Sequence, residues 1–172
     1  MTYVSSWNTT NYSQNYFEVT SGLGDTFIQF TGIPQTASSM WISIARLRTL
    51  GVTINTDLML RFNLDSTASY IYDNNYRTYI YAGTAAGTQN ARSDGSQSFS
   101  LIHMQGLSDA EYKTVTVYAA YNNQGTGLTP TVNTLQKRGI YKTSAVITNI
   151  SFALVGGAAI GSSSRFELWV AQ

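Results

Sequence analysis

The sequence contains no cysteine, and its 172 residues include a single histidine. Without cysteine the chain forms neither disulfides nor a thiolate zinc site. Only 11% of the residues are charged, against about 25% in typical soluble domains. Solubility must therefore depend on Ser, Thr, Asn and Gln. Such a surface either suits contact with neighbours, because few charges must be desolvated, or is the open face of a threonine-rich β-protein.

Clustered basic residues and long apolar runs are also missing. The formal net charge is +1, and the densest basic spots are pairs, Arg46 with Arg48 and Lys137 with Arg138, so we expect no nucleic-acid partner. No apolar run approaches the ~18 residues of a membrane span, and we expect no membrane association. The first fifteen residues lack the basic and apolar regions of a signal peptide. We therefore expect synthesis and folding in a cytosol.

Alternation of apolar and polar residues with a period of two recurs along the chain, whereas heptads and internal repeats are absent. The length suits one domain. We predict an all-β sandwich of about eight to ten antiparallel strands over residues 15–172, preceded by an N-terminal arm or first strand over residues 1–14. The predicted strands are 15–20, 25–30, 38–50, 57–63, 69–73, 76–83, 98–105, 112–121, 145–155 and 164–171.

Residues 58–83 combine tyrosines with acidic and amide side chains, which is typical of a sugar-binding or calcium-binding loop, or of strands joined by turns. Asp65 follows a strand and can accept a backbone N–H bond from two residues further on. The Asp-Asn-Asn at residues 73–75 suits a tight hairpin turn. Because these residues fall where turns require them, we favour the structural interpretation.

Candidate catalytic residues are few. Glycoside hydrolysis normally needs two facing carboxylates, and the three glutamates, Glu18, Glu111 and Glu167, lie in separate segments. His103 shares a strand face with Phe99, and a lone histidine on an apolar face is more often packed than catalytic. We expect no enzymatic activity.

Ligand-binding signals are weak as well. Asp65, Asp73 and Asp94 fall in predicted loops and could offer oxygen ligands to calcium, but no loop concentrates them. We expect no cofactor. Twelve tyrosines and three tryptophans could grip a carbohydrate; however, we expect Trp41 and Tyr118 to be buried in strands.

Three segments in order are similar to one family. They are "FIQFTGIPQTASSMWISIARLRT" (27–49), "LRFNLDSTASY" (60–70) and "ITNISFALVGGAAIGSSSRFELWV" (147–170). Together they resemble small jelly-roll virion proteins of tailed bacteriophages, which are capsid decoration proteins or tail-associated modules. The resemblance implies a jelly-roll β-sandwich and a non-enzymatic structural role in the virion.

On this basis we expect a capsid decoration protein on the outer surface of a phage, made in the host cytoplasm, with the major capsid protein or other virion proteins as partners. The alternative is a carbohydrate-binding receptor-recognition module of a tail or fibre tip, with a host surface glycan as ligand. The aromatic residues Tyr3, Trp7 and Tyr12 lie on the polar N-terminal segment, which either docks to a partner or packs on its own domain.

The closing strand, residues 164–171, suggests self-association. Phe166, Leu168 and Val170 should face the core, which leaves Trp169 on the outward face as a subunit contact. The resemblance and the threefold sites of capsid lattices favour a homotrimer, and a monomer is the competing state.

Overall fold

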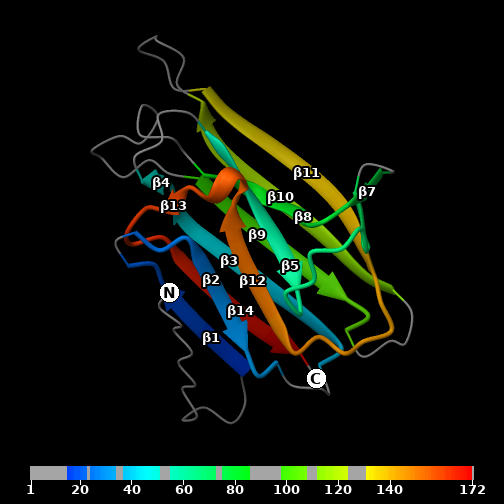
Figure 1. The fold of residues 1–172 in the computed structure, drawn as a ribbon. Coiled ribbons are helices and arrows are strands. Elements are labelled where there is room, and N and C mark those ends of the chain that lie inside the picture. Colours follow the sequence, from blue (N-terminus) through cyan, green and yellow to red (C-terminus); the bar gives the residue numbers. More distant parts are fainter. Residues whose placement is uncertain are drawn as a thin grey trace.

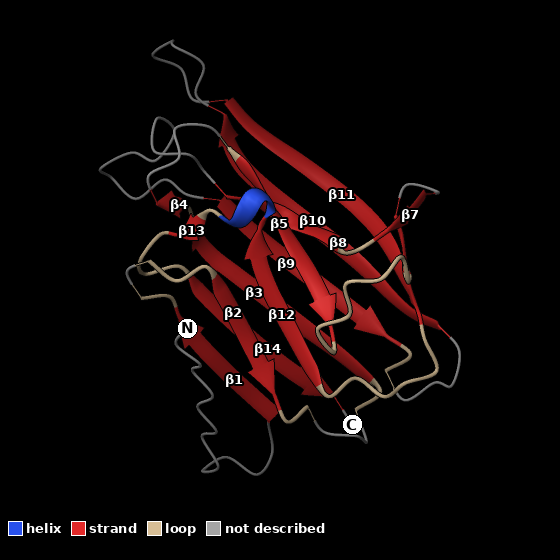
Figure 2. Cartoon of the chain, viewed as in Figure 1, coloured by secondary structure: helices blue, strands red, loops and turns tan. Residues whose placement is uncertain are grey.

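The computed structural model describes residues 15–22, 24–33, 37–50, 55–72, 75–85, 98–107, 112–123 and 131–171. Over these residues the chain consists of β-strands and their connections, and its one helical element is the three-residue 3₁₀ turn η1 (Val155–Gly157) (Figure 2). Twelve of the fourteen described strands form two sheets that pack face to face (Figure 1). The predicted all-β sandwich is confirmed.

The larger sheet has eight strands, and each described neighbour pair is antiparallel. In spatial order they are β1 (Asn15–Thr20), β14 (Arg165–Ala171), β3 (Ser39–Leu47), β9 (Ser98–Gln105), β10 (Tyr112–Asn123), β11 (Thr131–Lys142), β6 (Tyr70–Tyr72) and β7 (Asn75–Arg77).

The smaller sheet has four antiparallel strands. In spatial order they are β2 (Phe27–Thr31), β12 (Asn149–Leu154), β5 (Thr56–Phe62) and β8 (Ile80–Ala85). Two short strands, β4 (Thr49–Leu50) and β13 (Ala159–Ile160), pair separately. The described structure begins with β1 at Asn15, and residues 1–14, including Tyr3, Trp7 and Tyr12, lie outside the described residues.

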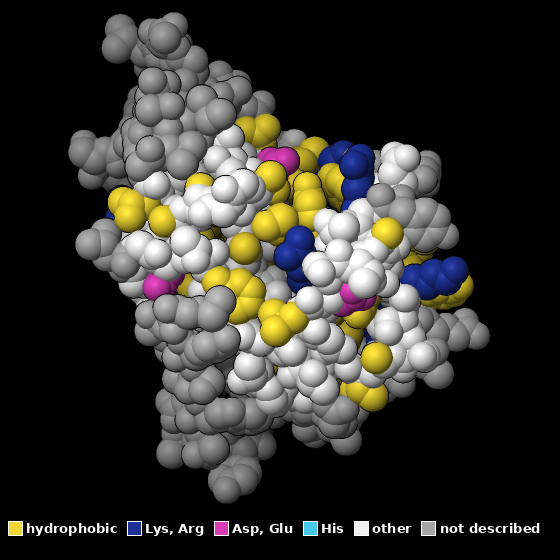
Figure 3. Space-filling model, viewed as in Figure 1, with side chains coloured by type: hydrophobic (Ala, Val, Ile, Leu, Met, Phe, Trp, Pro, Cys, Tyr) yellow, Lys and Arg dark blue, Asp and Glu magenta, His cyan; other side chains and the backbone are white. Residues whose placement is uncertain are grey.

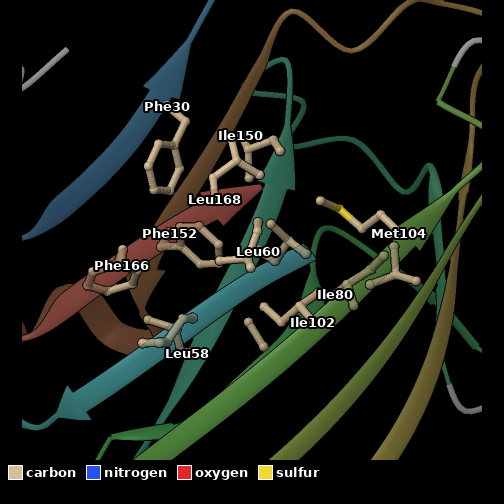
Figure 4. Close-up of a cluster of buried hydrophobic side chains, with 14 of the residues drawn as sticks. Phe30, Leu58, Leu60, Ile80, Ile102, Met104, Ile150, Phe152, Phe166 and Leu168 are labelled. Carbon is tan, nitrogen blue, oxygen red and sulfur yellow. The ribbon is translucent and has the colours of Figure 1, made fainter. Parts of the chain in front are cut away.

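The core forms because successive side chains of a strand point to opposite faces. In β14, Phe166, Leu168 and Val170 are buried, as the sequence predicts. Phe166 meets Phe152 of the smaller sheet with ring centroids 5.3 Å apart, and Phe152 meets Phe30 edge-on at 6.4 Å. Figure 4 shows these rings together with the aliphatic side chains of both sheets. Burial of these inner faces holds the two sheets together.

The structure differs from the predicted strands in several places. The predicted strand 38–50 is divided, because its last residues form β4, which pairs with the unpredicted β13 outside the larger sheet. The predicted strand 76–83 is divided, because the chain leaves the larger sheet after β7 and enters the smaller sheet at β8. No strand is predicted between residues 121 and 145, yet β11 fills most of that interval. In β11 the inward-facing Leu135 and Lys137 are only half-buried, so this strand lacks the apolar alternation that a covered strand requires.

The turn after β5 bears out the structural interpretation of Asp65. Its Oδ1 accepts the Thr67 backbone N–H at 2.8 Å and the Thr67 hydroxyl at 2.6 Å, and its Oδ2 accepts the Tyr141 hydroxyl at 3.1 Å. Burial raises the pKa of this carboxyl, but the hydrogen bonds from Thr67, Ser69 and Tyr141 together lower it below its ordinary value. Asp65 therefore ties the turn to β11. The predicted turn residues 73 and 74 lie outside the described residues.

The two sheets have unequal widths. β8 is the last strand of the smaller sheet; it packs mainly against β10 of the larger one and also contacts β9, β11 and β6. The larger sheet continues past this edge through β6 and β7. Part of its inner face is thus left without a facing strand.

Candidate functional site

Exposed aromatic side chains gather on the outward face of the larger sheet. Trp41 in β3 is 39% exposed, Phe99 in β9 is 43% exposed, and Tyr118 in β10 is 44% exposed. The expectation that Trp41 and Tyr118 are buried is wrong. Met40 and Ile42, the neighbours of Trp41 in β3, fill the core, and alternation along the strand turns the Trp41 side chain to the opposite face.

Trp41 lies in a row of side chains that crosses four strands. Trp169 of β14 is opposite Trp41, which is opposite His103 of β9, which is opposite Thr116 of β10. The rings of Trp41 and His103 are stacked with their centroids 4.0 Å apart and their planes 13° from parallel. We call the surface formed by Trp41, Phe99, Leu101, His103 and Tyr118 the Trp41 face.

A shallow hollow of about 320 Å³ lies beside this row, over β9, β10 and β11. Its lining includes Phe99, Tyr118, Ala120, Thr134 and Gln136 and contains no charged residue. Few charges would have to be desolvated if another surface covered it. The hollow extends the apolar character of the Trp41 face across the centre of the sheet.

Charged groups flank this surface at the β1–β14 edge. Glu18 and Glu167 are opposite each other across β1 and β14, although the sequence places them in separate segments. Both carboxylates form ion pairs with Arg165, and the Arg165 Nη2 to Glu18 Oε2 distance is 2.8 Å. This cluster lies beside the half-buried Trp169, on the outward face where the sequence predicts that tryptophan.

His103 packs as the sequence analysis expects, because its imidazole lies against the Trp41 ring on the same face as Phe99. The sequence does not reveal this stack, since Trp41 and His103 come from strands far apart in the chain. The outward position of Trp41 can be predicted from the alternation Met40, Trp41, Ile42. If Met40 and Ile42 face the core, the Trp41 side chain between them must face outward.

Candidate metal ligands are not brought together in the described part of the chain, where no group of three or more His, Asp or Glu side chains could hold a metal ion. The carboxylate oxygens of Asp65 bind Thr67 and Tyr141. Asp73 and Asp94 lie outside the described residues, as does Glu111.

The described helical turn is too short to cross a membrane.

Comparison of the sequence with protein-family models and with curated proteins gives no match. Function must therefore be inferred from the surfaces that the fold builds.

Proposed function

We propose that this chain is a non-enzymatic structural protein of a phage virion, a capsid decoration protein that docks on the outer surface of the capsid through the Trp41 face. The observation that carries the proposal is the set of exposed aromatic side chains on one open sheet face. Contiguous exposed apolar surface on a soluble protein marks an interaction site more often than chance placement does. Aromatic enrichment with few charges is the composition of the centre of a protein–protein interface.

The strand order supports the jelly-roll topology that the sequence resemblance implies. Eight strands, taken along the chain as β1, β2, β3, β5, β8, β9, β12 and β14, lie in the order first-eighth-third-sixth in one sheet and second-seventh-fourth-fifth in the other. Strands exchanged between two four-stranded sheets in this way form the double Greek key of a jelly roll. On this assignment β6, β7, β10 and β11 are additions that widen one sheet.

Contact through the Trp41 face is consistent with the energetics of aromatic anchors. Trp41 and His103 already hold each other by stacking, so little side-chain freedom remains to be lost on docking. Truncating a tryptophan at the centre of an interface costs about 2 kcal/mol or more, which is roughly a thirtyfold loss of affinity.

Self-association as a homotrimer is a second element of the proposal, with Trp169 as a subunit contact. Sedimentation equilibrium tests it: the native protein should have three times the 18.9 kDa mass of the chain, and Trp169→Ala should shift it towards monomer. A monomer of 18.9 kDa that is insensitive to Trp169→Ala would contradict the trimer. Deleting residues 1–14 tests the aromatic residues of that segment, Tyr3, Trp7 and Tyr12, in the same measurement.

The docking proposal is tested on particles of the phage whose genome encodes the chain. Purified protein is added to particles that lack it, and occupancy is measured by cryo-electron microscopy. The native protein should occupy regular positions on the shell, and Trp41→Ala should lower occupancy at limiting concentration. Leu64→Ala, which truncates a side chain that is 52% exposed away from this face, is the matched control. Unchanged occupancy for Trp41→Ala, or density in the tail alone, would contradict the proposal.

A further inference from the structure

A cleft of about 370 Å³ opens where the larger sheet extends past β8. Its walls come from β5, β8, β10 and β11 and from the β6–β7 segment, so distant parts of the chain meet there. In the view of Figure 1, hydrophobic and basic side chains lie beside one another where β8 and β11 run, with an acidic side chain close by (Figure 3). The volume lies within the ~300–1,000 Å³ range of small-ligand sites.

Four tyrosines supply the aromatic lining of this cleft: Tyr72, Tyr79, Tyr81 and Tyr121. The rings of Tyr72 and Tyr81 are near parallel, 21° apart with centroids at 6.2 Å. Lys137 Nζ lies 5.3 Å from the centroid of the Tyr72 ring, within the range of a cation–π contact. The wall is thus a set of aromatic rings with a cation held beside it.

Polar groups form a connected chain along the same wall. The Tyr81 hydroxyl and the Thr84 hydroxyl are 2.7 Å apart, and the Thr84 hydroxyl donates to Asp57 Oδ1 at 3.4 Å. Burial, aided by the charge of Asp57 and partly opposed by the hydrogen bond with Thr84, raises the pKa of Tyr81 to about 12. The Tyr81 hydroxyl therefore stays neutral at physiological pH and keeps its proton for hydrogen bonding.

The tyrosines could serve only to cover the part of the larger sheet's inner face that has no facing strand. That role would not explain why charged side chains also line the cleft. Asp57 and Arg77 are exposed at the rim, and Lys137 is half-buried. Two cations against one carboxylate give the lining a net single positive charge. A seal would be filled with apolar side chains, whereas this cleft stays open and combines aromatic faces, hydroxyls and an excess cation.

We propose that this tyrosine cleft binds a saccharide unit that carries one carboxylate. The apolar C–H face of a pyranose ring suits the tyrosine rings. Its hydroxyl groups match the hydrogen-bonding set of Tyr81, Thr84 and Asp57. Its carboxylate pairs with Arg77 at the rim and with Lys137 on the wall, as charge-assisted bonds favour. The ligand class is an acidic sugar, a uronic or a nonulosonic acid, as found in glycan chains.

This inference goes beyond docking to a virion, because the cleft lies on the opposite side of the larger sheet from the Trp41 face. Lys137 of β11 lines the cleft, and its neighbours along the strand, Gln136 and Arg138, point the other way. A subunit fixed to a particle through the Trp41 face would keep this cleft accessible. The two proposals can therefore fail independently.

Saturation-transfer difference NMR on the full chain tests the proposal with D-glucuronate, N-acetylneuraminate and D-glucose as probes. Glucose is the matched neutral probe, since it differs from glucuronate only at the carboxylate-bearing carbon. Both acidic sugars should give saturable responses, and glucose should bind more weakly by roughly tenfold, as expected for the loss of a charge-assisted contact.

Variants locate the binding in the cleft. Arg77→Ala and Tyr79→Ala should each weaken glucuronate binding by roughly tenfold. Arg138→Ala, a cation on the outward side of β11, and Tyr112→Ala, an exposed tyrosine remote from the cleft, are the matched controls and should bind like the native protein. Circular dichroism verifies folding, and Tyr79→Phe replaces Tyr79→Ala should the latter unfold, with a smaller loss expected from the missing hydroxyl.

Three outcomes would overturn the inference. The first is absence of a saturable response to all three sugars. The second is an equal response to glucose and glucuronate, which would remove the role given to Arg77 and Lys137. The third is glucuronate binding that both cleft variants leave intact. Trp41→Ala should not alter the sugar response, so failure of capsid docking and failure of sugar binding are distinguishable.

Discussion

Replacing Tyr70 by phenylalanine should destabilise the sandwich through a single buried hydrogen-bond network. Along β5, the Asn63 N–H donates to β12, so the Phe62 N–H points to the opposite side. Pairing of β5 with β8 on that side ends at Leu60. The Tyr70 hydroxyl takes over: it accepts the Phe62 N–H at 2.9 Å and lies 3.1 Å from the Asp65 carbonyl oxygen, to which it can donate.

The magnitude follows from the burial of these groups. Tyr70 is fully buried, and burial raises the pKa of its hydroxyl well above the ordinary value. Phenylalanine keeps the ring, which stacks on Tyr141 at 4.6 Å, so no large cavity forms. It leaves the Phe62 N–H without an acceptor, at a cost of about 1–3 kcal/mol. For a chain of this size, about 2 kcal/mol corresponds to a fall in melting temperature of roughly 4–8 °C.

Urea denaturation followed by tryptophan fluorescence measures this cost. Tyr70→Phe should lower the denaturation midpoint without changing the slope, because the surface exposed on unfolding is the same. Tyr112→Phe is the matched control, because the Tyr112 side chain is 47% exposed. The free energy of unfolding of this variant should stay within about 0.5 kcal/mol of the native value. If Tyr70→Phe were as stable as Tyr112→Phe, the hydrogen bonds of the Tyr70 hydroxyl would not contribute to the stability of the fold.

Three further changes have defined outcomes. Gly83→Ala should lower stability by about 1–3 kcal/mol, since Gly83 has a φ of 137° and an added Cβ would clash with the Ser100 hydroxyl; a denaturation midpoint equal to that of the native protein would refute this packing. Phe152→Ala should cost about 3–5 kcal/mol, because the ring is fully buried between both sheets; a calorimetric melting temperature within a degree or two of native would contradict that role. The lowered folded pKa of Asp65 means that its stabilising contribution is present above its ordinary value of 3.8 and is lost as the pH falls through the lowered value. Asp65→Asn should therefore be less stable than the native protein at pH 7, and the difference in stability should become smaller as the pH falls through the lowered pKa of Asp65. A difference in stability that grows in acid would contradict a stabilising role of the ionised carboxylate.

Local patterns carried much of the fold prediction. The strand 98–105 coincides with β9, because Ser98 to Gln105 alternates cleanly between a covered and an open face. The function of Asp65 as a turn residue was also accessible, since it depends on a bond to Thr67, only two residues away. β11 was missed because the smaller sheet covers only part of it, so apolar alternation is not imposed along its whole length.

The candidate sites were less predictable because they join residues that are distant in sequence. Trp41 and His103 stack only through the pairing of β3 with β9. Tyr72 and Tyr81 were interpreted as strand residues, which they are, but their meeting with Tyr121 depends on how far the larger sheet extends past β8. No local pattern encodes that width. The number of tyrosines shows that the protein is rich in aromatic residues, but it does not indicate which of these rings line the same cleft.

The position of β14 between β1 and β3 has a consequence for the order of folding. Asn15 pairs with Val170, and the opposite edge of β14 pairs with β3. β1 and β3 both pair with β14, so neither pairing can form until the chain has been synthesised as far as β14. At ~5–20 residues per second, the interval between synthesis of β3 and of β14 is seconds to tens of seconds. Contacts of such long sequence separation also slow folding after release. During synthesis the β3 residues Ile42 and Ile44 therefore lack the neighbouring strand β14. Nascent chains should depend on protection from aggregation until β14 has been synthesised and has paired with β3.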